Sequence, residues 1–384
     1  MPSRSRIILA ISALCLMLAP NLRASEPSFK IEHTWRLGGD GSWDYMAVDP
    51  ISHLLYIARL NRIMLVDLHT GKLVDEITGL THAHGIAFDK QGRVGYISDG
   101  GAGTILVFDR STYKILTTIH SGKNPDAVLF EPTQRRVFAF NGGSYDTTVI
   151  DADSNSIITK IPLPGRPEFS VTDGDGNVFV NIEDTSVVLR LDAATLKITA
   201  SWSLAPGETP SGLAIDVAGH RLFSVCDNDK MIILDSRTGK LIAAPSIGEG
   251  ADAVVFDPAH KLVFSSNGES GTMTVVRAAT PCGYNSIQTF TTKLGARTIA
   301  VDPSSGTVYT VSAALGPKPP ASPSNPKRRP AVLPDSFVVL VYSALRQRRH
   351  WVGSGPIGIR LALELSRARR TLISKSVPTL SLVQ

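Results

Sequence analysis

Seven positions, spaced 40 to 45 residues apart, carry mostly charged side chains that could hold a cation or anchor a ligand. Each lies five residues before an acidic residue that ends an apolar run, and the seven are Asp44, His84, Asp126, Glu168, Ser211, Asp252 and Arg297. Carboxylates that crowd one another raise their pKa values or require a cation. Three interpretations stay open: a solvated polar funnel, a small-molecule or peptide site anchored by these groups, and a divalent-ion site, for example for Ca²⁺, with hydrolytic chemistry of the lactonase kind.

The motif that sets this alignment returns seven times and indicates a repeat architecture. Its copies are MAVDP, IAFD, LFEP, SVTD, AIDV, VFDP and AVDP, with their acids at Asp49, Asp89, Glu131, Asp173, Asp216, Asp257 and Asp302. The clearest unit, residues 84–122, contains four short apolar runs at 85–88, 94–98, 104–108 and 114–120. A period near 40 with four strands per unit predicts an all-β fold, a seven-bladed β-propeller of four-stranded antiparallel blades.

The first strand of each blade would be the innermost, so the seven positions would surround one mouth of the central channel, which we call the top. Apolar walls are expected from Trp43, Tyr45, Pro125, Phe169 and Pro210. In the seventh unit the loop between the second and third strands is a Pro-rich insertion, residues 315–335, which contains Lys327, Arg328 and Arg329. Proline stiffens such segments, and the insertion is expected either to cover the mouth as a lid or to be an ordinary surface loop.

The two ends of the repeat region predict how the ring closes. The seventh unit has expected strands at 298–301, 307–312 and 337–342 but no clear fourth strand. The stretch FKIEHTWRLGG, residues 29–39, reads as a fourth strand with no blade before it. We therefore expect the N-terminal strand to pair into the last blade, which removes an exposed sheet edge.

The first 24 residues are predicted to be a signal peptide. Arg4 and Arg6 precede an apolar stretch of 13 residues, Ile7 to Ala19, which is too short to span a membrane as a helix. Cleavage after Ala24 would export the protein to the periplasm or medium. The mature chain keeps Cys226 and Cys282, which we expect at opposite faces and therefore without a disulfide.

The net charge of +5 hides two regions of opposite sign. Residues 316–384 hold 12 basic and 2 acidic residues, whereas residues 25–315 hold 24 basic and 32 acidic residues. Nucleic-acid binding needs clustered positive charge, so none is expected on the propeller body, residues 25–345. Residues 346–384 are a basic tail whose structure the sequence does not predict.

The recurring acids are interpreted as scaffold. Those that end the third strands are Asp67, Asp109, Asp151, Asp192 and Asp235, with Arg277 in the sixth copy. Carboxylates at such positions accept backbone N–H groups in turns. His82 and His84 would suit a haem or metal ligand pair, but the chain has no cysteine-based haem attachment motif and no serine in a nucleophile elbow. No catalytic residue is therefore assigned.

The ordered segments of the repeat resemble a known family. They include LGGDGSWDYMAVDP, GKNPDAVLFEP, NGGSYDTTVIDA, SIGEGADAVVFDP and FSSNGESGTMTVV. Together they resemble the YVTN-repeat β-propellers, specifically the YncE-like exported bacterial proteins, over residues 28–345. The resemblance implies seven blades, export and no catalytic activity common to the family. Residues 346–384 do not resemble it.

We therefore expect an exported, monomeric propeller that binds a small molecule or a protein partner at the top of its channel, without a cofactor or a membrane span. The seven positions named first are the candidate ligand-binding residues. The alternative is a channel-centred, metal-dependent hydrolase or lactonase that uses Ca²⁺.

Overall fold

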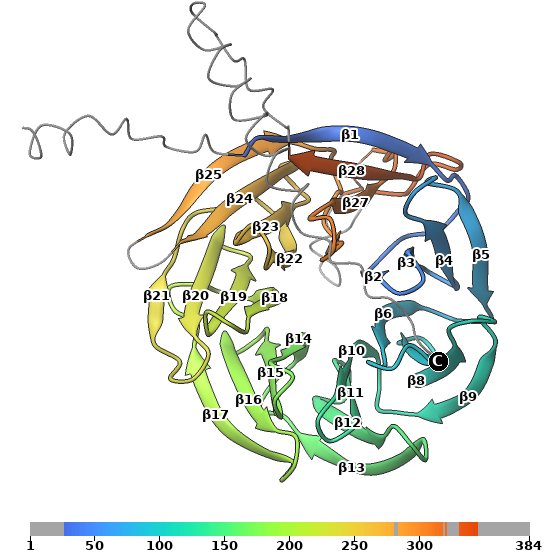
Figure 1. The fold of residues 1–384 in the computed structure, drawn as a ribbon, viewed down its shortest axis with the longest axis vertical. Helices are drawn as coiled ribbons and strands as arrows, with labels where there is room; N and C mark the ends of the chain where they lie inside the picture. Colours follow the sequence, from blue (N-terminus) through green and yellow to red (C-terminus); the bar gives the residue numbers. More distant parts are fainter. Residues whose placement is uncertain (1–26, 280–282, 318, 321–329, 345–384) are drawn as a thin grey trace, which may run out of the picture. The chain divides into compact units, whose positions relative to one another are not determined.

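The computed structural model describes residues 27–279, 283–317, 319–320 and 330–344. Their strands form seven four-stranded antiparallel sheets, which are arranged as blades around a central axis (Figure 1). No helix occurs in these ranges, and so none is present there that could cross a membrane. The predicted all-β, seven-bladed propeller is confirmed.

Each blade runs from the axis outward. The innermost strands are β2 (Met46–Asp49), β6 (Ala83–Phe88), β10 (Pro125–Glu131), β14 (Pro167–Thr172), β18 (Pro210–Asp216), β22 (Ala251–Asp257) and β26 (Ile299–Val301). The second strands are β3 (Leu54–Arg59), β7 (Val94–Asp99), β11 (Arg136–Asn141), β15 (Asn177–Ile182), β19 (Arg221–Cys226), β23 (Leu262–Asn267) and β27 (Val308–Ser312).

The outer half of each blade completes the sheets. The third strands are β4 (Arg62–Asp67), β8 (Thr104–Asp109), β12 (Asp146–Asp151), β16 (Val187–Asp192), β20 (Lys230–Asp235), β24 (Thr272–Ala279) and β28 (Val338–Ala344). The outermost strands are β5 (Leu73–Thr78), β9 (Ile115–His120), β13 (Ser156–Pro162), β17 (Lys197–Ser203), β21 (Leu241–Ala243), β25 (Gly283–Thr291) and, in the last blade, β1 (Phe29–Arg36).

The hydrophobic core lies between the faces of neighbouring blades. Middle strands are covered on both faces, so all six residues of β3 are buried, and the first five, LLYIA, read as a continuous apolar run. The outermost strands are largely exposed, and in β5 only Ile77 is buried. Burial therefore falls from the middle strands to the rim of each blade.

The N-terminal strand closes the ring, as predicted. β1 pairs antiparallel with β28, from Phe29 opposite Ala344 to Arg36 opposite Val338, and the two strands lie side by side at the rim in Figure 1. Closure pairs the edge that β28 would otherwise expose to solvent.

A buried arginine fastens the loop that follows β1. Arg59 is fully buried, and its guanidinium carbon lies 3.6 Å above the Phe337 ring, just before β28. Its Nη2 donates to the carbonyls of Gly39, Asp40 and Gly41 at 3.2, 2.8 and 3.2 Å. One side chain thus ties the first blade to the N-terminal loop and to the start of the last strand.

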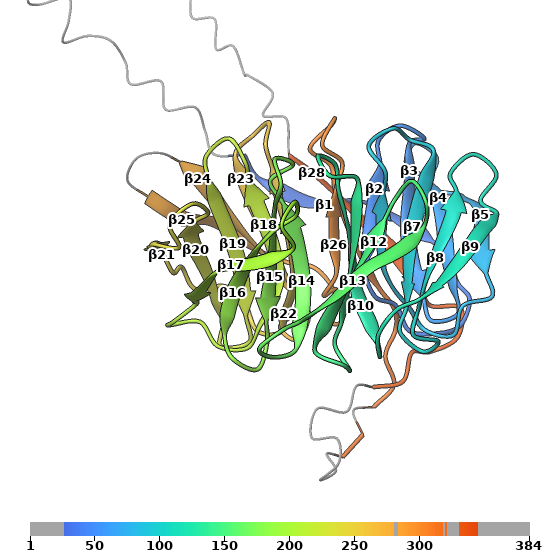
Figure 2. The ribbon, with the colours of Figure 1, turned by 90° about the horizontal axis from the view of Figure 1, so that it is seen from below.

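Several sequence expectations concern other parts of the chain. The base of the Pro-rich insertion forms an isolated bridge between Leu315 and Val332, both packed against the hydrophobic cluster that contains Trp43. The described ends of the insertion leave the ring at one face (Figure 2). Its basic residues 327–329, the signal segment 1–24, Cys282 and the tail 346–384 lie outside the described residues. Cys226 is a buried free thiol.

Candidate functional site

Most of the seven candidate residues lie in a β-bulge at the start of an inner strand; together the seven are called the mouth ring. In blade two, Ala83 pairs with Asp99 and the next pair is Ile86 with Ile97, so His84 and Gly85 share one position of the facing strand. The same irregularity occurs at the start of β10, β14, β18 and β22. A bulge re-aims a side chain that regular pairing would direct elsewhere, which accounts for the convergence of these residues.

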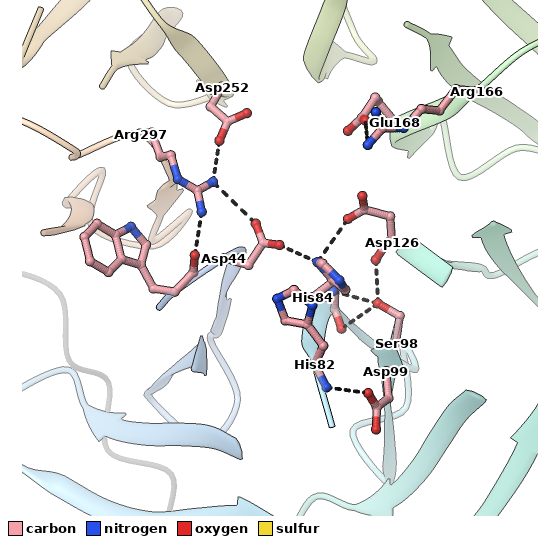
Figure 3. A network of polar contacts seen from close by, with 12 residues as sticks. Asp44, His82, His84, Ser98, Asp99, Asp126, Arg166, Glu168, Asp252 and Arg297 are labelled. Atoms are coloured by element: carbon pink, nitrogen blue, oxygen red, sulfur yellow. Dashed lines mark hydrogen bonds and ion pairs between the residues drawn. The ribbon is translucent and has the colours of Figure 1, made fainter. Parts of the chain in front are cut away.

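Five members of the mouth ring form one continuous chain of charged contacts. Arg297 bonds Asp252 and lies 3.6 Å from Asp44. Asp44 also bonds His84 Nδ1, and this nitrogen lies 3.4 Å from the Asp126 carboxylate. Figure 3 shows this chain running from Asp252 to Asp126. The sequence alignment thus placed together residues from blades six, seven, one, two and three.

The other two members of the mouth ring do not join that chain through an ion pair. Glu168 pairs with Arg166 at 3.1 Å, and Arg166 also holds Glu183 at 2.9 Å. Ser211 donates from Oγ to the carbonyl of Ala251 at 3.0 Å. Ser211 therefore links the inner ends of blades five and six rather than adding charge to the mouth ring.

Burial and repulsion between neighbouring carboxylates raise the pKa values of two carboxyl groups of the mouth ring. Burial, reinforced by the Asp44 carboxylate, raises the pKa of Asp126 to about 6. Burial, reinforced by Asp126 and Glu183, raises the pKa of Glu168 to about 9 despite Arg166. At neutral pH Glu168 thus keeps its proton, because the mouth ring holds more carboxylates than nearby cations can neutralise.

The neighbouring histidine and tyrosine respond to the same acids. Burial lowers the pKa of His84, but the hydrogen bond with Asp44 and the charge of Asp126 outweigh it, and the net pKa is raised. Burial and four carboxylates, those of Asp126, Glu168 and two others of the mouth ring, raise the pKa of Tyr45 well above its ordinary value. The Tyr45 hydroxyl therefore stays protonated and can act as a hydrogen-bond donor.

The histidine has one further unusual atom. Its Nε2 is buried and has no hydrogen-bond partner among the described residues, and a methyl group on Gly100 would lie 2.7 Å from it. His82 lies beside His84, with ring centroids 4.4 Å apart and the ring planes tilted by 45°. The two rings are thus neighbours, as expected from the sequence.

Sequence reasoning missed the residues that position the mouth ring. Ser98 accepts from Gly85 N–H at 2.7 Å and donates to the carbonyl of Asp126 at 2.5 Å. Asn181 donates to the Ser211 carbonyl at 2.9 Å, and Ser266 to the Arg297 carbonyl at 2.5 Å. Each is a polar residue at the fifth position of a six-residue second strand, and that recurrence is the sequence signal that could have identified them.

Arg166 was also missed, although the alignment contained it. It lies two residues before Glu168, in the column that contributes His82 in blade two. The expected apolar wall needs one correction: Trp43 is buried against Phe337, with ring centroids 5.7 Å apart. Its carbonyl, rather than its ring, reaches the mouth ring and accepts from Arg297 at 2.5 Å.

The recurring acids act as scaffold, as interpreted. Asp49 accepts the backbone N–H groups of Ile51 and Ser52 at 2.9 and 3.3 Å, and Asp109 accepts those of Ser111 and Thr112 at 2.9 and 2.7 Å. They hold turns, whereas the residue type in the mouth ring changes from blade to blade.

Three members of the mouth ring could share a metal ion. Asp44, His84 and Asp126 offer ligand atoms that lie within 4.8 Å of one another. Ca²⁺ takes six to eight oxygen ligands, whereas one imidazole nitrogen with carboxylates suits Zn²⁺. Arg297, 3.6 Å from Asp44, opposes binding of any cation by that carboxylate.

Comparison with known proteins gives distant relatives. No family model matches the chain. It is 26% identical over 221 residues to the "Uncharacterized protein YncE" of Salmonella typhimurium (strain LT2), covering 56% of this chain and 49% of the relative. The protein of the same name from Salmonella typhi gives the same identity and coverage.

The chain spans about half the length of the curated relatives it matches. The sequence match and the seven-bladed fold are consistent with each other. The chain is homologous to these proteins, and its seven-bladed ring fits a YncE-like β-propeller family.

Proposed function

We propose that the protein binds a small ligand, or a side chain of a protein partner, through a positively charged group held by the mouth ring. The observation that carries this proposal is the excess of buried carboxyls there. Asp126 and Glu168 have raised pKa values, and a cation placed between them would offset their repulsion and favour their ionised forms.

The cations already present support a positively charged ligand over an anion. Arg297 is satisfied by Asp252, Asp44 and the Trp43 carbonyl, and Arg166 is shared by Glu168 and Glu183. An anion would have to displace these carboxylates and would meet the others at close range. A cation needs no such rearrangement.

The proposal is tested with the smallest matched pair of probes, n-propylamine and propionate, at equal ionic strength. The amine should stabilise the folded protein in a thermal-shift titration, more strongly at pH 8 than at pH 6 because ionised carboxylates attract it. The variant Asp126→Asn with Glu168→Gln should lose this effect.

A matched control removes two exposed charges instead. Asp75 and Asp175 are exposed, so Asp75→Asn with Asp175→Asn should leave the amine titration unchanged. Equal shifts with propionate, or an unchanged response in the Asp126 and Glu168 variant, would overturn the proposal.

A metal-dependent hydrolase or lactonase is the second candidate, supported by the Asp44, His84 and Asp126 donors. When bound, a metal ion would supply Lewis-acid chemistry. Elemental analysis of the purified protein decides between the two. A stoichiometric divalent ion that is lost in His84→Ala would favour the metal site, whereas its absence, with no thermal shift by Ca²⁺ or Zn²⁺, would favour cation binding by the mouth ring alone.

Export and a monomeric state belong to the same proposal. The basic residues Arg4 and Arg6, followed by a short apolar stretch, support a signal peptide cleaved after Ala24. Cell fractionation with N-terminal sequencing of the mature protein tests export, and light scattering tests the monomer. A retained N-terminus in the cytosol would contradict export.

A further inference from the structure

The central channel contains an apolar cavity of about 300 Å³. It is lined by the inner strands of blades one, four, five, six and seven, β2, β14, β18, β22 and β26. Its lining includes the small residues Ala47, Gly212, Ala253 and Ala300. This volume is at the lower end of the range for small-molecule sites.

Two aromatic rings bound the cavity on the side of blades two and three. Tyr45 of blade one and Phe169 of blade four meet edge to face, with centroids 5.0 Å apart. Their blades are not adjacent, so the pair crosses the channel. The inner strands of blades two and three, β6 and β10, do not line the cavity.

The cavity lining directly follows the mouth ring along the chain. Three of its lining residues, Tyr45, Phe169 and Ala253, each directly follow a carboxylate of the mouth ring. The charges of Asp44, Asp126, Glu168 and Asp252 all act on the Tyr45 hydroxyl. An apolar space therefore lies next along the chain to carboxylates, and Tyr45 both lines that space and feels their charge.

We propose that the ligand is an amine with an apolar body, whose ammonium group binds the mouth-ring carboxylates while its hydrocarbon part fills the channel cavity. This inference rests on the proposed function and adds the class of ligand. A carboxylate with the same body would place its charge against Asp252 and the other ionised carboxylates of the mouth ring. A hydrophilic amine would leave the cavity lining without apolar contacts.

A series of n-alkylamines from propyl to octyl tests the proposal by calorimetric titration at pH 8. Each buried methylene should tighten binding about fourfold, until the chain fills the cavity and the affinity stops rising. The n-alcohols of the same lengths should bind at least about tenfold more weakly, because they lack the charge.

A cavity-filling variant with a matched control locates the hydrocarbon part. Ala47 lines the cavity, whereas Ala87 holds the equivalent place in blade two and does not. Ala47→Leu should weaken hexylamine binding about tenfold or more and leave propylamine binding nearly unchanged. Ala87→Leu should alter neither by more than about twofold, and unchanged melting temperatures of both variants would show that they fold.

The possible failures are distinguishable. Amine binding could require Asp126 and Glu168 and yet have an affinity that changes neither with chain length nor in Ala47→Leu. In that case the proposed function stands and this inference is overturned. If alcohols bind as tightly as amines, the cavity does not act together with the mouth ring and the inference is again overturned. If no amine binds, both proposals are wrong.

Discussion

Glu168 shows most directly how the mouth ring is built, because its pKa is raised further than that of Asp126. Its pKa is raised from 4.5 to about 9 by burial and by neighbouring carboxylates. The unfolded chain loses this proton above pH 4.5, while the folded protein keeps it until about pH 9. Between these values the folded state binds more protons, so stability falls as pH rises.

Replacing the Glu168 carboxyl by a neutral amide should remove this pH dependence of the stability. We predict that Glu168→Gln raises the melting temperature at pH 8 by about 2–4 °C, the shift that ~1 kcal/mol produces in a large domain. The gain should be smaller at pH 5, where both states hold more of the proton. Differential scanning calorimetry across pH 5 to 8 measures the difference.

The control for this prediction is Asp75→Asn, which removes one exposed carboxylate. Its melting temperature should differ from that of the unmodified protein by the same small amount at every pH. A pH-independent gain in Glu168→Gln would show that the residue is ionised in the folded protein at pH 8, which would contradict its raised pKa.

The alignment predicted which residue types gather at the mouth but not how they pair. Asp44 and His84 could be placed together because they occupy one column of the repeat. That Asp44 lies between Arg297 and His84, and that Arg166 turns toward Glu168, depends on side-chain conformation. Those conformations are decided by packing across the ring, which repeat spacing does not report.

At the scale of elements, the bulges and the second strands act together. A bulge turns the inner residue toward the channel, and Ser98, Asn181 or Ser266 then holds the backbone of the next blade by a hydrogen bond. The sequence predicted the strands from their apolar pattern. The bulges were not predicted, because an extra residue in a strand does not change which of its residues are apolar.

Arg59 gives a prediction at this scale. In Arg59→Met the carbonyls of Gly39, Asp40 and Gly41 would lose their shared donor, and the Phe337 ring would lose its guanidinium partner. These three hydrogen bonds are partly buried, and losing the partner of a desolvated polar group costs about 1–3 kcal/mol. We expect a loss of about 2 kcal/mol in all, because the Asp40 carbonyl keeps its bond from Arg62. Urea unfolding measures the loss.

The neighbouring Arg62 is the matched control. It pairs with Glu76 at 2.8 Å and donates to the Asp40 carbonyl at 3.2 Å, but both contacts are partly exposed, and surface pairs contribute about 0–1 kcal/mol. Arg62→Met should therefore cost less than about 1 kcal/mol. Equal losses in the two variants would mean that Arg59 does not fasten the closing loop.

The whole molecule depends on a single closing strand. β1 supplies the outer strand of a blade whose other three strands come from residues 299–344. Deleting residues 25–37 should lower the melting temperature sharply, because it uncovers β28 and removes Phe29 from the core. A synthetic peptide of those residues should restore part of the loss, and an unchanged melting temperature would show that β1 does not hold the ring.

The number of blades, their strand order and this closure all followed from the repeat, because they depend on periods and on matching ends. The cavity did not follow from it. Tyr45 and Phe169 were expected as walls of the mouth, but their contact across the channel joins residues three blades apart. Only the diameter of the closed ring determines whether two such side chains meet.

The central claim is that a cation binds among the mouth-ring carboxyls. Some of these carboxyls are protonated in the free protein and should lose their protons when a positive charge binds beside them. Titrating hexylamine calorimetrically at pH 7.5, in buffers of different ionisation enthalpy, counts the protons released from the protein on binding. We predict a release of close to one proton, lost when Glu168→Gln is combined with Asp126→Asn. Binding without proton release, or the same release from the double variant, would contradict the claim.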